Sequence, residues 1–186
     1  MKEAIILHGV CRNHEYYEMA VPSPSNNHWL PWLQQKFLRG GVLCQCLEMP
    51  TPYQPKYEEW REMFERLYRP NLKTVVGHSS GAGFILKWLH DNPDVKLEKL
   101  VLVAPFIDPS RQYGEFLKFD FNKEALDNVG EVHLFISNDD KEGILQSTEQ
   151  ILTTYPNIIT HKYTGLRHFC LRDVGESFED IWKVCK

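Results

Sequence analysis

The segment Leu72–Leu89 reads LKTVVGHSSGAGFILKWL, an apolar run followed by a glycine-bearing turn and an amphipathic stretch. We expect a strand over Leu72–Val76 and a helix over Gly83–His90, because a short β-branched run favours a strand and the later apolar residues have helical spacing. The turn between them, Gly77-His78-Ser79-Ser80-Gly81, has the G-x-S-x-G pattern. Between a strand and a helix, this pattern is typical of a nucleophile elbow, a strained turn that raises a serine hydroxyl above the sheet.

The glycines indicate which serine of the turn is the candidate nucleophile. Glycine stands two residues before and two residues after Ser79, where a tight turn needs room, whereas His78 and Ala82 flank Ser80 at the same offsets. The alternative is an ordinary strand–helix connection with a serine that caps the helix. The pattern in its context favours Ser79 as a nucleophile.

The rest of the chain repeats this alternation of short apolar runs and longer amphipathic stretches. We expect further strands at Ala4–Leu7, Val42–Met49, Leu97–Val103, Val132–Ser137 and Ile158–Tyr163. We expect further helices at His28–Arg39, Tyr57–Tyr68, Ile144–Thr154 and Ser177–Val184. Buried strands that alternate with helices predict a parallel sheet covered on both faces by right-handed crossovers. The predicted fold class is therefore α/β, a three-layer α/β/α sandwich with a mostly parallel sheet.

Length and composition indicate a single domain over residues 1–186, because no linker or internal repeat interrupts the pattern. With 42% hydrophobic and 25% charged residues, the chain falls outside the disordered and fibrous classes. The formal net charge of −4 argues against a protein that binds nucleic acid by neutralising phosphates. We expect a monomer.

Compartment and membrane association follow from the apolar runs and the cysteines. No run approaches the about 20 apolar residues that span a bilayer, and the first run is too short for a secretory signal, so no membrane association is expected. The five cysteines (Cys11, Cys44, Cys46, Cys170, Cys185) contain no C-x-x-C pair. We therefore expect reduced thiols, no metal site and a cytoplasmic protein.

A serine hydroxyl needs a base to act as a nucleophile, and the base needs a carboxylate to orient it. After this kind of turn the chain order is Ser…Asp/Glu…His. Among the downstream histidines, His133 and His161 fall within predicted strands, and only His168 lies in a loop that follows a strand. His168 is therefore the candidate base.

The candidate acids are Asp139 and Asp140, which follow the predicted strand Val132–Ser137. Spacing alone does not separate these two residues, and either could instead cap a turn. The carboxyl ends of parallel strands share one edge of a sheet, so we expect Ser79, one of these carboxylates and His168 to meet there.

Backbone N–H groups are expected to stabilise the oxyanion that forms when the serine attacks a carbonyl. The pattern predicts one donor at Ser80, directly after the nucleophile, and one in the loop after the first strand, for which Val10 is the candidate. The long segment Cys11–Asn27 that follows is aromatic and acidic, and whether it forms a lid over the site stays open.

These residues resemble the compact α/β-hydrolases of the retinoblastoma-binding protein nine and YdeN group of serine hydrolases. The resemblance covers essentially the whole chain and rests on the elbow, on Asn138-Asp139-Asp140, on His168-Phe169 and on Trp29-Leu30-Pro31-Trp32-Leu33. It implies a minimal α/β-hydrolase fold without a cap domain, for which Ala104–Glu131 is too short. By motif it implies that Ser79 is the nucleophile, His168 the general base and Asp140 the acid.

The expected function is hydrolysis of a small carboxylic ester, thioester or amide by a carboxylesterase-like serine hydrolase, through an acyl-enzyme and without a cofactor. Its expected partner is a small-molecule acyl substrate. One alternative is a catalytically weak hydrolase fold that serves as a protein-binding module. Another is a metal-dependent hydrolase that uses His8, His78, Asp140 and His168, although no H-E-x-x-H motif supports it.

Overall fold

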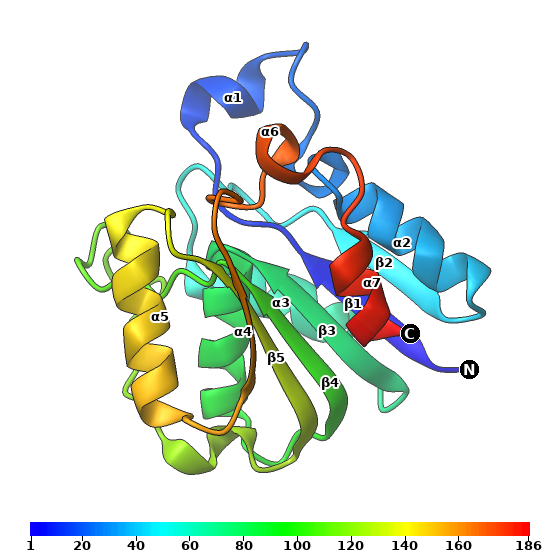
Figure 1. Cartoon of the computed structure of the whole chain (residues 1–186), viewed down its shortest axis with the longest axis vertical. Coiled ribbons are helices and arrows are strands. Elements are labelled where there is room, and N and C mark those ends of the chain that lie inside the picture. Colours follow the sequence, from blue (N-terminus) through cyan, green and yellow to red (C-terminus); the bar gives the residue numbers. More distant parts are fainter.

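Six parallel strands form one sheet in the order β2-β1-β3-β4-β5-β6 in the computed structural model, which describes residues 1–186. Figure 1 shows the twisted sheet with helices on both of its faces. The strands are β1 (Glu3–Leu7), β2 (Leu43–Leu47), β3 (Leu72–His78), β4 (Leu97–Val103), β5 (Val129–Ser137) and β6 (Ile159–Tyr163). The predicted three-layer α/β/α sandwich is confirmed, and the sheet is parallel throughout.

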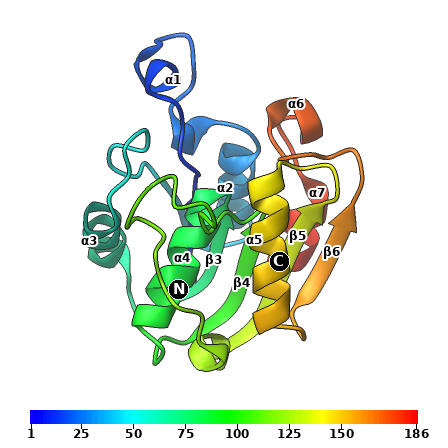
Figure 2. The same ribbon diagram turned by 90° about the vertical axis from the view of Figure 1, so that its left-hand side faces the viewer.

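Helices cover the two faces of the sheet unequally (Figures 1 and 2). The α-helices are α1 (Asn13–Tyr17), α2 (Leu30–Arg39), α3 (Tyr57–Leu67), α4 (Ser80–Asp91), α5 (Glu142–Thr154), α6 (Leu171–Val174) and α7 (Glu179–Cys185). Two 3₁₀ turns, η1 (Pro24–Asn26) and η2 (Lys123–Leu126), complete the chain. Helices α3, α4 and α5 pack on one face, and α2 and α7 pack on the other. No helix combines the length and the apolar character that crossing a bilayer requires.

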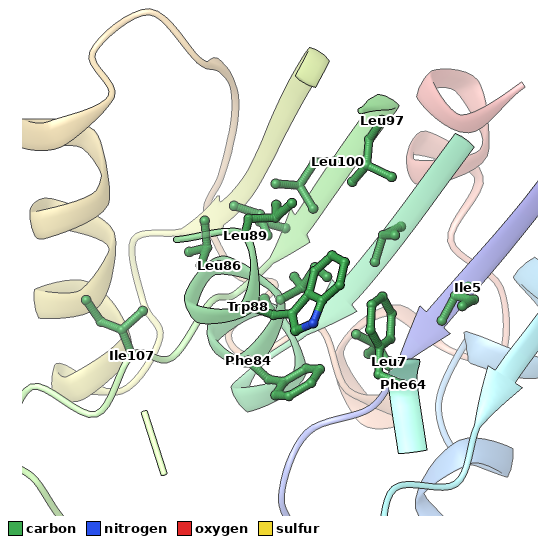
Figure 3. Packing of buried hydrophobic residues seen from close by; sticks show 14 of the residues in the cluster. Ile5, Leu7, Phe64, Phe84, Leu86, Trp88, Leu89, Leu97, Leu100 and Ile107 are labelled. Carbon is green, nitrogen blue, oxygen red and sulfur yellow. The ribbon is translucent and has the colours of Figure 1, made fainter. Parts of the chain in front are cut away.

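The core consists of two hydrophobic clusters, one on each side of the sheet. Alternate residues of one strand enter different clusters: Ile5 and Leu7 of β1 face α3 and α4, whereas Ala4 and Ile6 face α2. Figure 3 shows the first cluster, in which Phe84 and Trp88 of α4 lie against the sheet. Because both faces of each central strand are buried, these strands are continuous apolar runs in the sequence.

Local boundaries differ from the prediction at several points. Helix α4 begins at Ser80 rather than Gly83, because the turn after β3 is a single residue long. Two short helices, α1 and α6, were not predicted. Between β4 and β5 the only helical turn is η2, so no cap domain covers the sheet edge.

Replacing Gly81 with alanine should destabilise the fold. A Cβ at this position would lie 2.4 Å from the carbonyl oxygen of His8 and 2.7 Å from that of Leu7, so backbone has to move. We expect a loss of about 2 kcal/mol in the free energy of unfolding, even though alanine is the better helix former. Urea unfolding measures this loss. The control is Gly143→Ala in α5, where a Cβ meets only the ring edge of Phe106 at 3.2 Å, so an equal loss there would contradict the argument.

Candidate active site

The turn at Ser79 has the strained backbone expected of an elbow. Ser79 is the single residue between β3 and α4, and its φ of 56° and ψ of −124° lie in a region that non-glycine residues rarely adopt. Its N–H donates to the carbonyl of Val103 at 2.9 Å, and its carbonyl accepts from the N–H groups of Ala82, Gly83 and Phe106 at 3.0, 3.2 and 3.1 Å. Such conformations cost about 1–3 kcal/mol and persist where surrounding bonds fix them, as these four do.

The glycine before the serine lets the helix approach the strand. A Cβ on Gly77 would lie 2.6 Å from the Cα of Ala82, closer than atoms can pack. Together with the close approach at Gly81, this explains in steric terms why glycine stands on both sides of Ser79 at an offset of two.

The structure brings Ser79 together with His168, which lies in the loop between β6 and α6. The Nε2 atom of His168 is 3.0 Å from the Oγ of Ser79, and its Nδ1 atom is 2.9 and 3.1 Å from the two carboxylate oxygens of Asp140. Since Nδ1–H donates to the carboxylate, Nε2 carries the lone pair and accepts from the serine hydroxyl. The side chains of His168 and Asp140 are only 13% and 1% exposed, so little water competes for these bonds.

The two neighbouring carboxylates make different contacts. Asp140 meets the His168 ring, whereas Asp139 accepts hydrogen bonds from the Ser137 hydroxyl and from the backbone N–H groups of Gly165 and Arg167, the latter two at 3.1 and 3.2 Å. The hydroxyl of Ser137 and these backbone donors hold the pKa of Asp139 below its usual value. Of the two acids that spacing left open, Asp140 is the one in contact with the ring.

Two residues that line the cleft beside Ser79 have backbone N–H groups that could stabilise an oxyanion. Ser80 is the first residue of α4, a position whose N–H has no acceptor within its helix, and the N–H of Val10 donates to no other group of the protein. Both residues line the cleft. The residues predicted as oxyanion donors therefore line the same cleft as Ser79.

His8 supports this loop. Its Nε2 accepts from the N–H of Met49 at 2.8 Å, so its Nδ1–H donates to the carbonyl of Gly9 at 2.6 Å. Burial lowers the pKa of His8, which keeps the ring neutral as this pairing requires. Both ring nitrogens are thus occupied by backbone groups, and the structure has no cluster of three His, Cys, Asp or Glu side chains spaced to bind a metal ion.

A cleft of about 1270 Å³ opens above Ser79 and His168. Residues of the segment Cys11–Asn27, among them Arg12, Glu15 and Tyr16, form one wall. Phe106, Tyr113 and Lys141 belong to the lining as well. Of the other aromatic residues between β4 and β5, Phe116 is buried in the core, and Phe119 and Phe121 pack around His90.

Two thiols also line the cleft, Cys11 and Cys170. Burial raises the pKa of each to about 11, so both are protonated at neutral pH and are poor nucleophiles. Ser79 is therefore the only side chain in this part of the cleft that has a paired histidine to activate it.

Three side chains at this site make contacts with the His168 loop that the sequence did not predict. His78 donates from Nε2 to the carbonyl of His168 at 2.8 Å, and Trp29 donates to the carbonyl of Phe169 at 2.9 Å. His28 accepts from the N–H of Leu171 at 3.0 Å. The partners are 90, 140 and 143 residues apart in the chain, respectively, and no local pattern signals such contacts.

Comparison with known proteins places the chain among hydrolases. A family model described as serine hydrolase matches residues 22–155. The putative hydrolase YdeN of Bacillus subtilis (strain 168) is 28% identical over 181 residues, which cover 94% of this chain and 88% of YdeN. The YdeN part of the resemblance expected from the sequence is thereby supported.

Solved structures agree with the fold. The crystal structure of the ydeN gene product of B. subtilis has a TM-score of 0.81 at 24% identity and covers 100% of this chain and 97% of its own. The serine hydrolase CCSP0084 from Cycloclasticus zankles has a TM-score of 0.65 at 15% identity, covering 100% and 89%. An esterase domain from Rhodothermus marinus has a TM-score of 0.61 at 13% identity, covering 94% and 83%.

Proposed function

This chain belongs to the serine hydrolase family, and from that premise we propose that it cleaves a small carboxylic ester, thioester or amide through an acyl-enzyme on Ser79. The observation that carries the proposal is the unbroken contact from the Ser79 hydroxyl through the His168 ring to Asp140, with distances of 3.0 and 2.9 Å. This order of nucleophile, base and carboxylate is the arrangement that activates a serine.

The first half of the reaction transfers the acyl group to the protein. Nε2 of His168 takes the hydroxyl proton as the Oγ of Ser79 bonds to the substrate carbonyl carbon, and the carbonyl oxygen becomes an oxyanion. The N–H groups of Ser80 and Val10 donate to that oxyanion. The tetrahedral intermediate then expels the leaving group, which receives the proton from His168, while Asp140 stabilises the imidazolium that exists between the two transfers.

The second half releases the acyl group as an acid. His168 takes a proton from water, the water oxygen bonds to the acyl carbon, and the bond to Ser79 Oγ breaks as His168 returns the proton to the serine. Every proton taken up in one step is given back in the next. No group outside the protein and the water is needed.

The cleft supports carboxylesterase-like activity on small acyl compounds. It is open and large enough for both the acyl and the leaving group, and the aromatic rings of Phe106 and Tyr113 offer apolar surface near the serine. Residues of the segment Cys11–Asn27 line the cleft, so we expect this segment to influence which substrates bind.

A fluorophosphonate probe tests the proposal directly. The wild-type protein should gain one adduct by intact mass, because such probes react with activated serines, and Ser79→Ala should gain none. The matched control is Ser110→Ala, which removes another hydroxyl of the cleft lining and should keep the adduct. Folded wild-type protein that gains no adduct would refute the proposed mechanism.

A further inference from the structure

The loop that carries His168 has an unusual backbone on both sides of the histidine. Arg167 has a φ of 41° and Phe169 a φ of 53°, and both are non-glycine residues in the left-handed region. Each such residue costs about 1–3 kcal/mol and is retained only where its surroundings fix it. The orientation of the His168 ring therefore depends on what holds this loop.

The part of the loop before His168 is held from β5 and its following turn. Asp139 accepts from the N–H groups of Gly165 and Arg167, and the Ser137 hydroxyl accepts from the N–H of Leu166 at 3.2 Å. These bonds hold residues 165–167. The carbonyl of His168 and the residues after it bond to other partners.

The part after Arg167 is held by three side chains from elsewhere in the fold. His78, the last residue of β3, donates to the carbonyl of His168 itself. Trp29 and His28, which precede α2, bond to Phe169 and Leu171 on either side of Cys170. Of these three contacts, only that of His78 links the elbow directly to the base. His78 precedes Ser79 in the chain, and it bonds to His168, whose ring contacts the Ser79 hydroxyl.

The rings around His78 are packed closely together. The centroid of the His78 ring lies 5.1 Å from that of His168, 5.6 Å from that of His28 and 5.8 Å from that of Trp29. His78 is 3% exposed, so its ring has little freedom to turn away from the carbonyl of His168.

His78 and His28 are neutral donors and acceptors at this place. Burial, followed by the neighbouring His168, lowers the pKa of His78 well below its usual value and that of His28 to about 4. Neutral rings supply hydrogen bonds without placing a second positive charge beside the imidazolium that forms on His168 during the reaction. A lysine or arginine donor would oppose that charge.

We propose that His78 is a positioning residue, whose hydrogen bond to the backbone carbonyl of His168 holds the imidazole in line with both Ser79 and the leaving group. This inference rests on the proposed function, in which His168 is the general base and acid. His78 is 3% exposed, and in this proposal it acts on the reaction through His168. Its hydrogen bond connects the elbow to the loop that carries the base. The bond therefore helps to set the distance between Ser79 Oγ and His168 Nε2.

His78→Gln and His78→Leu test this role as a pair. The glutamine amide reaches as far from the backbone as the imidazole Nε2 and keeps a donor, whereas leucine has none. We expect His78→Leu to lower kcat about 10- to 100-fold with KM nearly unchanged, because small misplacements of a catalytic group have effects of this size. We expect His78→Gln to restore kcat to within about threefold of the wild type.

The choice of ester gives a readout that a purely structural role would not change. An alkoxide leaves only if His168 protonates it, whereas p-nitrophenolate leaves without help. A misplaced His168 should therefore reduce kcat/KM for an alkyl acetate at least about 10-fold more than for p-nitrophenyl acetate. His90→Leu is the control: His90 is a half-buried histidine that bonds to Leu86 and Tyr155, and its loss should lower the melting temperature but leave the ester ratio unchanged.

Each outcome bears on the inference. An unchanged kcat and ester ratio in His78→Leu, or a glutamine variant as impaired as the leucine variant, would overturn it. If His78→Leu does not fold, His78→Asn replaces it, because its shorter amide falls short of the His168 carbonyl. Crystal structures of the variants separate this inference from the proposed function: if the wild type is inactive but the His168 ring shifts when the bond is lost, only the function has failed.

Discussion

Ser79→Ala should lower turnover of an ester about 10⁴- to 10⁶-fold while the protein remains folded. The Oγ atom is the only part of the residue that the substitution removes, and it is the atom that forms the acyl bond. The strained backbone at φ 56° depends on bonds from the N–H and carbonyl of residue 79, which alanine keeps. Initial rates on p-nitrophenyl acetate measure the loss, and thermal melting checks the fold.

Adding His168→Ala to Ser79→Ala should cause little further loss. The base acts through the serine hydroxyl at 3.0 Å, so without that hydroxyl it has no proton to take. His168→Ala alone should be nearly as impaired as Ser79→Ala, and the double variant close to either. The residual rate then comes from the backbone donors at Ser80 and Val10. Strictly additive losses would mean that the two side chains do not act as a unit.

Asp140→Asn is expected to lower turnover about 10³- to 10⁴-fold. An amide in place of the carboxylate no longer fixes the proton on Nδ1 of His168, and it provides no negative charge for the imidazolium. Because Asp140 is almost completely buried, water cannot take over this role. The measurement compares kcat of Asp140→Asn with that of the wild type. The rate of fluorophosphonate labelling is a second measure of the reactivity of Ser79.

Asp139→Asn is the matched control, one residue away. It keeps an oxygen that can accept from the loop backbone, so we expect turnover to fall less than about 10-fold. The pKa of the Asp139 carboxyl is lowered in the fold, so its stabilising contribution is present above the pKa of the unfolded chain and is lost as the pH falls through the folded value. The free energy of unfolding of Asp139→Asn should therefore decrease less steeply than that of the wild type as the pH falls. Asp139→Asn that is more impaired in turnover than Asp140→Asn would reverse the two assignments.

The sequence predicts the sheet well, because each strand is a short segment with its own apolar pattern. Each central strand is a continuous apolar run because both of its faces are buried, and Ser79, Asp140 and His168 each lie in the turn or loop that follows a strand. The shared edge of a parallel sheet then brings them together. The helices α1 and α6 have five and four residues, which is too few for local propensity to stabilise them. No sequence pattern therefore predicts these two helices.

The choice between Asp139 and Asp140 depends on how two distant loops meet. Both residues follow β5, and only the path of the loop 28 residues later decides which carboxylate reaches the His168 ring. The roles of His28, Trp29 and His78 are hidden for the same reason. Their partners are backbone groups, which have no residue type that a sequence pattern could indicate.

The parallel sheet also has a consequence for the order of events during folding. Its paired residues are never close in the chain: the nearest, such as Thr74 and Lys99, are 25 positions apart, and Ala4 pairs with Thr74 across 70. Loops of this length must close before any ladder forms, which makes such topologies slow to fold. His168 joins Ser79 across a separation of 89 residues. The pairing of Ser79 with His168 therefore has to wait until these long loops have closed.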